Sequence, residues 1–200
     1  MQQPQPLANA LWRSDSAVRH IVLILAASWL VAIAAQIKVP MFPVPISLQT
    51  LAILFVGFTL GSRLGAGALI AYVAQGAAGL PVFAGAGLGL ATLMGPTGGF
   101  IIGFIAMAYI AGRAAETGLA SGFVSTALVG VFASAILYVP GILWPMYLAV
   151  LSGVDAGWAA QGFGFYWQYF IAPFLLGDAI KAALAALLVA GGWSALKARG

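Results

Sequence analysis

The chain has 200 residues, of which 63% are hydrophobic and only 6% are charged, and its formal net charge is +4. A soluble surface needs about a quarter charged residues. The composition therefore excludes a soluble domain and predicts a single membrane domain over residues 1–200. The Lys and Arg residues are scattered and form no basic face, so nucleic-acid binding is not expected. The chain contains no cysteine, which excludes disulfides and thiol nucleophiles.

Continuous apolar stretches predict an all-α integral membrane protein with six transmembrane helices. A β-barrel is not expected, because its strands would alternate apolar and polar residues. A chain of this length allows roughly six spans of about 20 residues with short loops. A polar segment, residues 1–17, precedes a six-helix bundle over about 18–195. The expected spans, in chain order, are about 18–37, 46–61, 65–80, 99–112, 122–150 and a last one that opens near Pro173.

The first apolar stretch is expected to be an uncleaved helix. Arg13 and Arg19 precede it, as positive charges precede the apolar core of a secretory signal. The run from Val18 to Ile37 is nevertheless long enough to span a bilayer, and more spans follow it. The segment KVPMFPVP, residues 38–45, then ends the helix, because a helix cannot run through its prolines.

Other segments depart from regular helix patterns. Segment 81–99, PVFAGAGLGLATLMGPTGG, is too rich in glycine for a span and too apolar for an exposed loop. We expect it to fold inward, where protein protects its backbone. Prolines inside 122–150 predict a kinked or broken helix. The aromatic residues of 152–170 are typical of the interfacial belt of membrane proteins.

The distribution of Lys and Arg predicts that both termini lie in the cytoplasm. With six spans, Lys38 falls on the outer side and Lys181 within a span, while the other cations fall on the inner side. The Pro-rich, Gly-rich and aromatic segments then face outward, where they are expected to cap a binding pocket. The inner cations are Arg13, Arg19, Arg63, Arg113, Lys197 and Arg199.

Asp178 and Lys181 are the leading functional candidates, because they lie in an otherwise apolar span. They are three residues apart and so share one face of a helix. Each costs about 2.5 to 3.5 kcal/mol at the centre of a membrane helix, and less toward the interface, so both must face the bundle interior and find partners. A purely structural role, in which the two residues bridge each other or satisfy loop backbone, remains an alternative.

Four stretches stand out in this order: VPISLQTLAILFVG, GSRLGAGALIAYVAQGAAGLPVFAGAGLG, LMGPTGGFIIGF and PFLLGDAIKA. In order and spacing they resemble the motifs of the BioY family, the biotin-specific S components of energy-coupling factor (ECF) transporters. The resemblance covers about residues 20–190. It implies a six-helix protein of a bacterial or archaeal plasma membrane that captures biotin from outside. It also implies three partners, namely a transmembrane coupling subunit and two cytoplasmic ATPases. The chain departs from the family pattern at 155–172, and no contact is carried over onto that segment.

The resemblance also implies a pocket that binds biotin. Biotin has a ureido ring with two N–H donors and a carbonyl acceptor, an apolar body and a carboxylate. Asp178 can accept from the ureido N–H groups, and Lys181 can donate to the ureido oxygen or pair with the carboxylate. The outward loop is expected to press backbone and ring against the ligand through Phe83, Ala84, Gly85 and Gly87. Neutral hydrogen bonds, or alternatively packing between helices, are expected from Gln49, Tyr72 and Tyr138.

Small residues on the first span suggest a second kind of contact. Ser28 and Ala32 are four apart, with Ala35 near the same face, and such surfaces let helices approach closely. The resemblance implies that this face contacts the coupling subunit. It would equally serve a homo-oligomer or dense packing in lipid.

Motifs of several enzyme classes are missing from the sequence. The chain has no P-loop, and GAGLG at 85–89 lacks the spacing of a dinucleotide site. His20 is its single histidine, so neither a metal site nor a cofactor is predicted. No nucleophile accompanies Asp178 and Lys181, and Glu116 is expected on the opposite side of the membrane. We therefore predict that the chain is not an enzyme. The alternatives are a carrier of another vitamin-like molecule and, more distantly, an intramembrane enzyme or a structural subunit.

Overall fold

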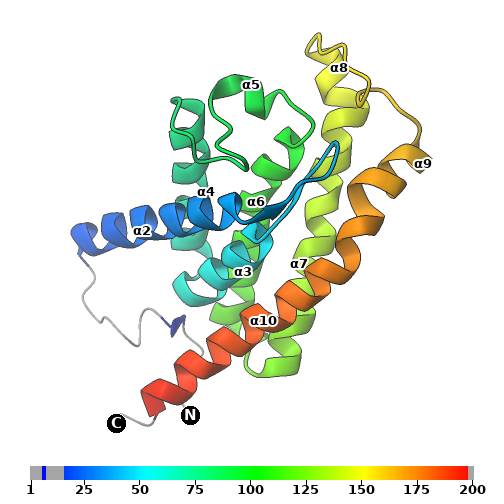
Figure 1. The fold of residues 1–200 in the computed structure, drawn as a ribbon. Helices are drawn as coiled ribbons and strands as arrows, with labels where there is room; N and C mark the ends of the chain where they lie inside the picture. Colours follow the sequence, from blue (N-terminus) through cyan, green and yellow to red (C-terminus); the bar gives the residue numbers. More distant parts are fainter. Residues whose placement is uncertain (1–5, 8–15, 198–200) are drawn as a thin grey trace.

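The computed structural model of the chain describes residues 6, 7 and 16–197, most of them helical (Figure 1). Four helices in this part are long and apolar enough to cross a membrane, namely Ala17–Gln36, Gly98–Thr117, Phe123–Leu151 and Phe163–Leu196. The expectation of a mainly helical, multi-pass membrane protein is thereby confirmed. Two of the cations used to predict the orientation, Arg13 and Arg199, lie outside the described residues, as does most of the polar segment 1–17.

The elements follow one another through short connections. Their bounds in chain order are α2 Ala17–Gln36, β1 Lys38–Val39, β2 Ile46–Ser47, α3 Gln49–Leu60, α4 Ser62–Ala77, α5 Gly89–Leu93, α6 Gly98–Thr117, α7 Phe123–Leu143, η1 Trp144–Leu148, α8 Ala149–Leu151, α9 Phe163–Tyr166, η2 Trp167–Ile171 and α10 Ala172–Lys197. Helices α3 and α4 occupy the predicted second and third spans but are shorter than the four long helices.

The first predicted helix and its end agree with α2. Ser16 caps the helix by accepting a hydrogen bond from the backbone N–H of Arg19 at 3.2 Å. The helix ends before the Pro-rich segment, which forms the turn of a small antiparallel hairpin. In its register Lys38 pairs with Ser47, and Val39 pairs with Ile46. The prolines predict the end of the helix but not the hairpin.

Two long helical runs contain π turns where the sequence has proline or crowded aromatics. The predicted irregularity in 122–150 is confirmed, because α7 contains Pro140 and passes through the π turn η1 into α8. Helix α10 begins at Ala172, next to Pro173 as predicted. It continues a helical run from Phe163, however, so the second half of the aromatic segment 152–170 is helix rather than loop. The side chains of Tyr166 and Phe170 in this run are buried, which shows that the aromatics also pack inward.

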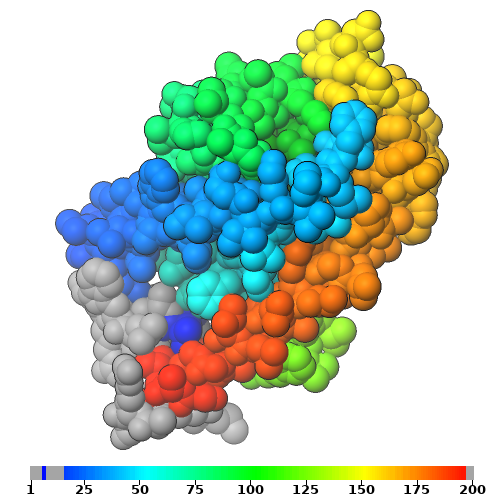
Figure 2. All heavy atoms as spheres, in the orientation of Figure 1, coloured from blue at the N-terminus to red at the C-terminus, as the bar shows by residue number. Residues whose placement is uncertain are grey.

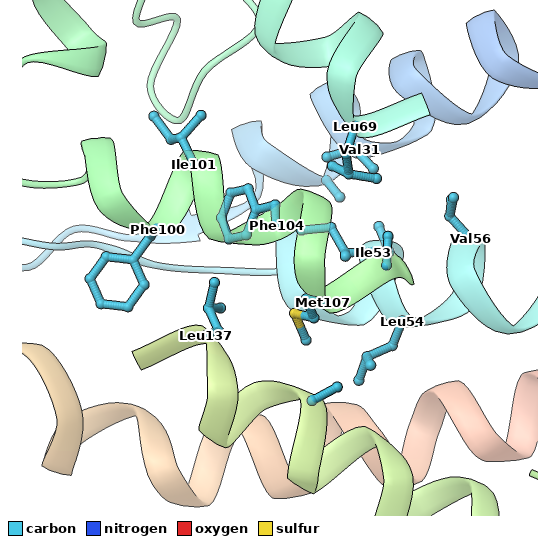
Figure 3. Close-up of a cluster of buried hydrophobic side chains, with 14 of the residues drawn as sticks. Val31, Ile53, Leu54, Val56, Leu69, Phe100, Ile101, Phe104, Met107 and Leu137 are labelled. Carbon is cyan, nitrogen blue, oxygen red and sulfur yellow. The ribbon is translucent and has the colours of Figure 1, made fainter. Parts of the chain in front are cut away.

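Helix α6 is the centre of the packing and contacts α3, α4 and α7, while α10 packs against α7 and α3. Figure 3 shows the core between these helices, where Phe104 and Met107 of α6 lie near Leu137 of α7. Glycine allows the backbones to approach closely, because a Cβ at Gly57 would lie 2.6 Å from the carbonyl oxygen of Ala108. Small residues therefore set the distance between the central helices.

The small-residue face of α2 points inward, which corrects the expectation of a partner surface. Ser28 and Ala35 are fully buried, and Ala32 is 4% exposed. Gln75 of α4 donates a hydrogen bond to the Ser28 hydroxyl at 3.1 Å, so this face is an intramolecular contact between α2 and α4. The exposed positions of α2 carry large apolar residues such as Trp29. Figure 2 shows α2, in blue, at the surface of the molecule.

The Glu116 carboxylate fastens the turn between α3 and α4 to the end of α6. Glu116 accepts hydrogen bonds from the backbone N–H of Ser62 at 2.7 Å and from the Ser62 hydroxyl at 2.9 Å. Arg113 donates to the same carboxylate at 2.9 Å. Gly112 lies against this turn, and a Cβ there would overlap the backbone of Gly61 and Ser62. The turn is therefore held by the Glu116 carboxylate, and it can pack this closely on α6 because Gly112 has no side chain.

Replacing Gly112 by alanine should destabilise the protein. The added methyl meets backbone rather than a flexible side chain, and such overpacking costs about 1 to 3 kcal/mol. Gly191→Ala is the matched control, because a Cβ at this helical glycine meets open space and improves helix propensity. Thermal unfolding in detergent should show a lower midpoint for Gly112→Ala and an unchanged or higher one for Gly191→Ala. Equal midpoints would contradict the close contact.

Candidate ligand-binding site

A cavity of about 230 Å³ lies inside the bundle, between the helices and the irregular segments. Its volume is several times the roughly 30 Å³ that one water molecule occupies in the liquid. Aromatic, aliphatic and proline side chains form most of the wall, and its polar groups come from several elements, with both charged groups on α10. The lining residues are Pro43, Val44, Pro45, Ser47, Gln49, Thr50, Tyr72, Phe83, Ala84, Thr92, Pro96, Thr97, Phe100, Ile101, Phe104, Leu137, Tyr138, Phe174, Asp178 and Lys181.

Asp178 and Lys181 contribute opposite charges to this wall. Both side chains are almost fully buried, at 7% and 9% side-chain exposure, and Nζ of Lys181 lies 3.2 Å from Oδ1 of Asp178. Their spacing of three residues on α10 places them on the same helix face, as predicted. The pair adds no net charge to the cavity, which limits the cost of burying it.

Three donors from three helices hold the Asp178 carboxylate. Besides Lys181 of α10, Thr50 of α3 donates to Oδ1 at 3.0 Å, and Tyr138 of α7 donates to Oδ2 at 2.6 Å. A carboxylate has about four lone-pair sites, so one site remains for a ligand N–H group. Asp178 is therefore positioned by its neighbours and still has capacity to accept a hydrogen bond.

Lys181 retains donors that can reach a ligand. An ammonium group has three N–H bonds, and one of them is directed to Asp178. The other two can serve a ligand oxygen in the cavity, with most strength if that oxygen is anionic. The pair thus presents a donor and an acceptor side by side, which suits a ligand that carries both kinds of group.

Gln49 and Tyr72 belong to a hydrogen-bonded chain that links the hairpin to the loop after α4. The Ser47 hydroxyl donates to Gln49 at 3.0 Å, Gln49 donates to the Tyr72 hydroxyl at 2.9 Å, and Tyr72 donates to the carbonyl of Val82 at 3.3 Å. Both residues line the cavity, but this chain occupies the Tyr72 proton and part of the Gln49 amide. Their positions fit both alternatives from the sequence, ligand contact and packing between helices.

The loop after α4 brings Phe83 and Ala84 to the cavity wall. The Phe83 ring is fully buried and meets the Tyr72 ring edge-on, at a centroid distance of 5.4 Å. It fits because Gly76 has no side chain, and a Cβ there would overlap the ring. Gly85 and Gly87, which were expected at the ligand, are not among the lining residues. Gly85 lies instead against the side chain of Lys38, and Gly87 lies against Thr92.

Several lining residues were not singled out from the sequence. Thr50 follows Gln49 directly in the stretch VPISLQT, so the motif carried a usable signal. The apolar walls Phe100, Phe104 and Phe174 carried none, because aromatic residues in a membrane helix face lipid, core or ligand with the same sequence pattern. Among the described residues, no three His, Cys, Asp or Glu side chains form a group that could hold a metal ion.

Comparison with known proteins gives one consistent family. The BioY family matches residues 5–198. The "Biotin transporter BioY" of Rhodobacter capsulatus is 37% identical over 183 residues, 85% of this chain and 90% of that protein. The "Probable biotin transporter BioY" of Pyrococcus horikoshii is 35% identical over 161 residues, 80% of this chain and 86% of that protein.

A solved structure shares the fold. It is described as the S-component for biotin from an ECF-type ABC transporter, and its TM-score to this chain is 0.64 at 24% identity. The match covers 86% of this chain and 89% of that one. Together with the family match over nearly the whole length, the identity to the curated relatives shows that this chain belongs to the BioY family.

Proposed function

We propose that this chain is a high-affinity, membrane-embedded biotin-binding subunit that serves biotin uptake and is not an enzyme. The observation that carries the proposal is the buried Asp178–Lys181 pair in the wall of an otherwise mostly apolar cavity. Curated relatives named as biotin transporters support the choice of ligand. Intramembrane ionisable residues of this kind are functional candidates by default, because burying them is expensive.

The chemistry of biotin matches the groups in the cavity. The free lone pair of Asp178 can accept from a ureido N–H, and the two remaining donors of Lys181 can bind the ureido oxygen or the carboxylate. The apolar body of the ligand fits between aromatic walls such as Phe100 and Phe174. Phe83 and Ala84 form part of the cavity wall. No reaction is required of any of these groups, and the proposed task is recognition and release.

The proposed arrangement in the membrane is a single domain of six spans, with both termini in the cytoplasm of a bacterium or archaeon. Support comes from Arg63 and Arg113, which lie at one end of the bundle near the turn between α3 and α4. Lys38 lies beside Gly85 near the cavity loops, in the segment that the positive-inside rule places outside. We propose that biotin enters from the side of these loops.

The proposed partners are a transmembrane coupling subunit and two cytoplasmic ATPase subunits. Support comes from the solved S-component that shares the fold and is part of an ECF-type ABC transporter. The small residues Ser28, Ala32 and Ala35 are buried in this chain, so they are not proposed as the docking surface.

Purified protein should bind biotin, and removing either charge of the pair should weaken binding by at least about 100-fold. Lys181→Ala removes the cation and leaves Asp178 buried without it, while Asp178→Asn removes the anion. Arg113→Ala is the matched control, because it breaks an ion pair of the same i, i+3 spacing outside the cavity. Isothermal titration of monodisperse samples measures all four proteins. Failure of the unmodified protein to bind biotin would refute the proposed ligand, and unchanged affinity in folded Lys181→Ala would refute the site.

Tyr138→Phe should reduce biotin affinity by about 10- to 100-fold, because it removes a hydrogen bond to the Asp178 carboxylate. Tyr166→Phe loses the same hydroxyl group from a buried ring that does not line the cavity. It breaks hydrogen bonds to Trp158 and Gln161 only, so its biotin affinity should equal that of the unmodified protein. A comparable loss in both variants would mean that the effect is general destabilisation rather than positioning of the carboxylate.

A further inference from the structure

The side chain of Gln36, the last residue of α2, is bonded to the loop after α4. Its Oε1 accepts a hydrogen bond from the backbone N–H of Ala86 at 3.0 Å. Its Nε2 donates to the carbonyl of Phe83 at 3.1 Å and lies 3.4 Å from that of Val82. Nε2 also donates to the backbone carbonyl of Ala32 at 3.1 Å, which holds the side-chain amide against its own helix. One carboxamide thus joins α2 to both arms of the loop.

The loop itself is a compact unit over residues 82–87. The N–H of Phe83 donates to the carbonyl of Gly87 at 3.1 Å, which closes the turn. Gly85 and Ala86 adopt positive φ values of 71° and 58°. The side chain of Lys38 covers Gly85 so closely that a Cβ would overlap it. The tip of the loop therefore rests on residues 36–38, at the start of the hairpin.

This loop is one of the non-helical parts of the cavity wall. Phe83 and Ala84 line the cavity, whereas Gln36 does not. The helical parts of the wall belong to the packed core, so the irregular parts are the ones that open at low cost. Figure 2 shows α2 and the hairpin at the surface next to the green segments that follow α4. An opening of loop 82–87 away from α2 would give access to the cavity.

We infer that Gln36 is a positioning residue that latches loop 82–87 over the cavity, and that breaking this latch is a step in ligand entry and release. The inference rests on the proposed function for its ligand, biotin. Tyr72 and the buried Phe83 ring also hold the loop, so Gln36 supplies part of the closing free energy.

The position of the latch outside the cavity has a kinetic consequence. Its bonds join protein to protein and touch no lining group that is free to bind ligand, so they stabilise the closed loop equally with and without biotin. Weakening them should speed association and dissociation by a similar factor and leave the dissociation constant nearly unchanged. A residue that contacts biotin would instead raise the dissociation constant, mainly through faster dissociation.

The kinetic test compares Gln36→Met and Gln36→Glu with the unmodified protein. Methionine keeps the length and removes the side-chain hydrogen bonds to the loop, and we expect both rate constants for biotin to rise about tenfold. Glutamate can still accept from Ala86 but faces the Phe83 carbonyl with an anion, so its effect should be at least as large. Gln75→Leu is the matched control, because Gln75 bonds α4 to Ser28 of α2 and makes no contact with the loop tip. Its rate constants should not change.

A second measurement is independent of biotin. Hydrogen exchange read by mass spectrometry should show faster exchange at the Ala86 amide in Gln36→Met, which removes the acceptor of this N–H, and unchanged exchange in Gln75→Leu. Unchanged exchange in Gln36→Met would overturn the latch, and so would a rise in the dissociation constant that comes from dissociation alone. If the unmodified protein binds no biotin, the proposed function fails, and the exchange at Ala86 alone decides whether the latch exists.

Discussion

The buried pair of Asp178 and Lys181 is the constraint on which the rest of the site depends. Two charges in an apolar interior are tolerated only if their lone pairs and protons are satisfied. The protein meets this requirement with a lysine from the same helix and hydroxyl groups of Thr50 and Tyr138 from α3 and α7. The three helices that supply these donors must therefore keep a fixed relative position, which explains why the cavity lies where they meet.

The helical framework supplies that fixed position by close packing of small residues. Backbones approach where Gly57 meets Ala108 and where Gly112 meets the turn at Gly61. Van der Waals contact of this kind replaces the hydrophobic driving force, which is weak between helices in lipid. The irregular segments have a different task. They form part of the cavity wall and are held by a few hydrogen bonds, from Gln36 and Tyr72. Breaking these hydrogen bonds costs less free energy than separating helices of the packed core.

Sequence patterns predict some features of this structure and not others. Helix positions and the shared face of Asp178 and Lys181 followed from periodicity and spacing. The direction of the small-residue face on α2 did not follow, because small residues serve contacts within a chain and between chains equally well. Gly85 shows the same limit. The sequence predicted that Gly85 allows a ligand to approach closely, but the group that lies against Gly85 is the side chain of Lys38.

The sequence by itself determined that the protein is a helical membrane protein, that its first helix ends before the Pro-rich segment, and which two charges must face inward. These features depend on local composition and on the cost of charge in lipid, both of which a sequence displays directly. Only the tertiary structure decided that Thr50 and Tyr138 hold Asp178, that Gly87 lies outside the cavity wall, and that Gln36 binds the loop after α4. The hydrogen bonds among these features join residues 40 to 128 positions apart in the chain, so no local pattern displays them.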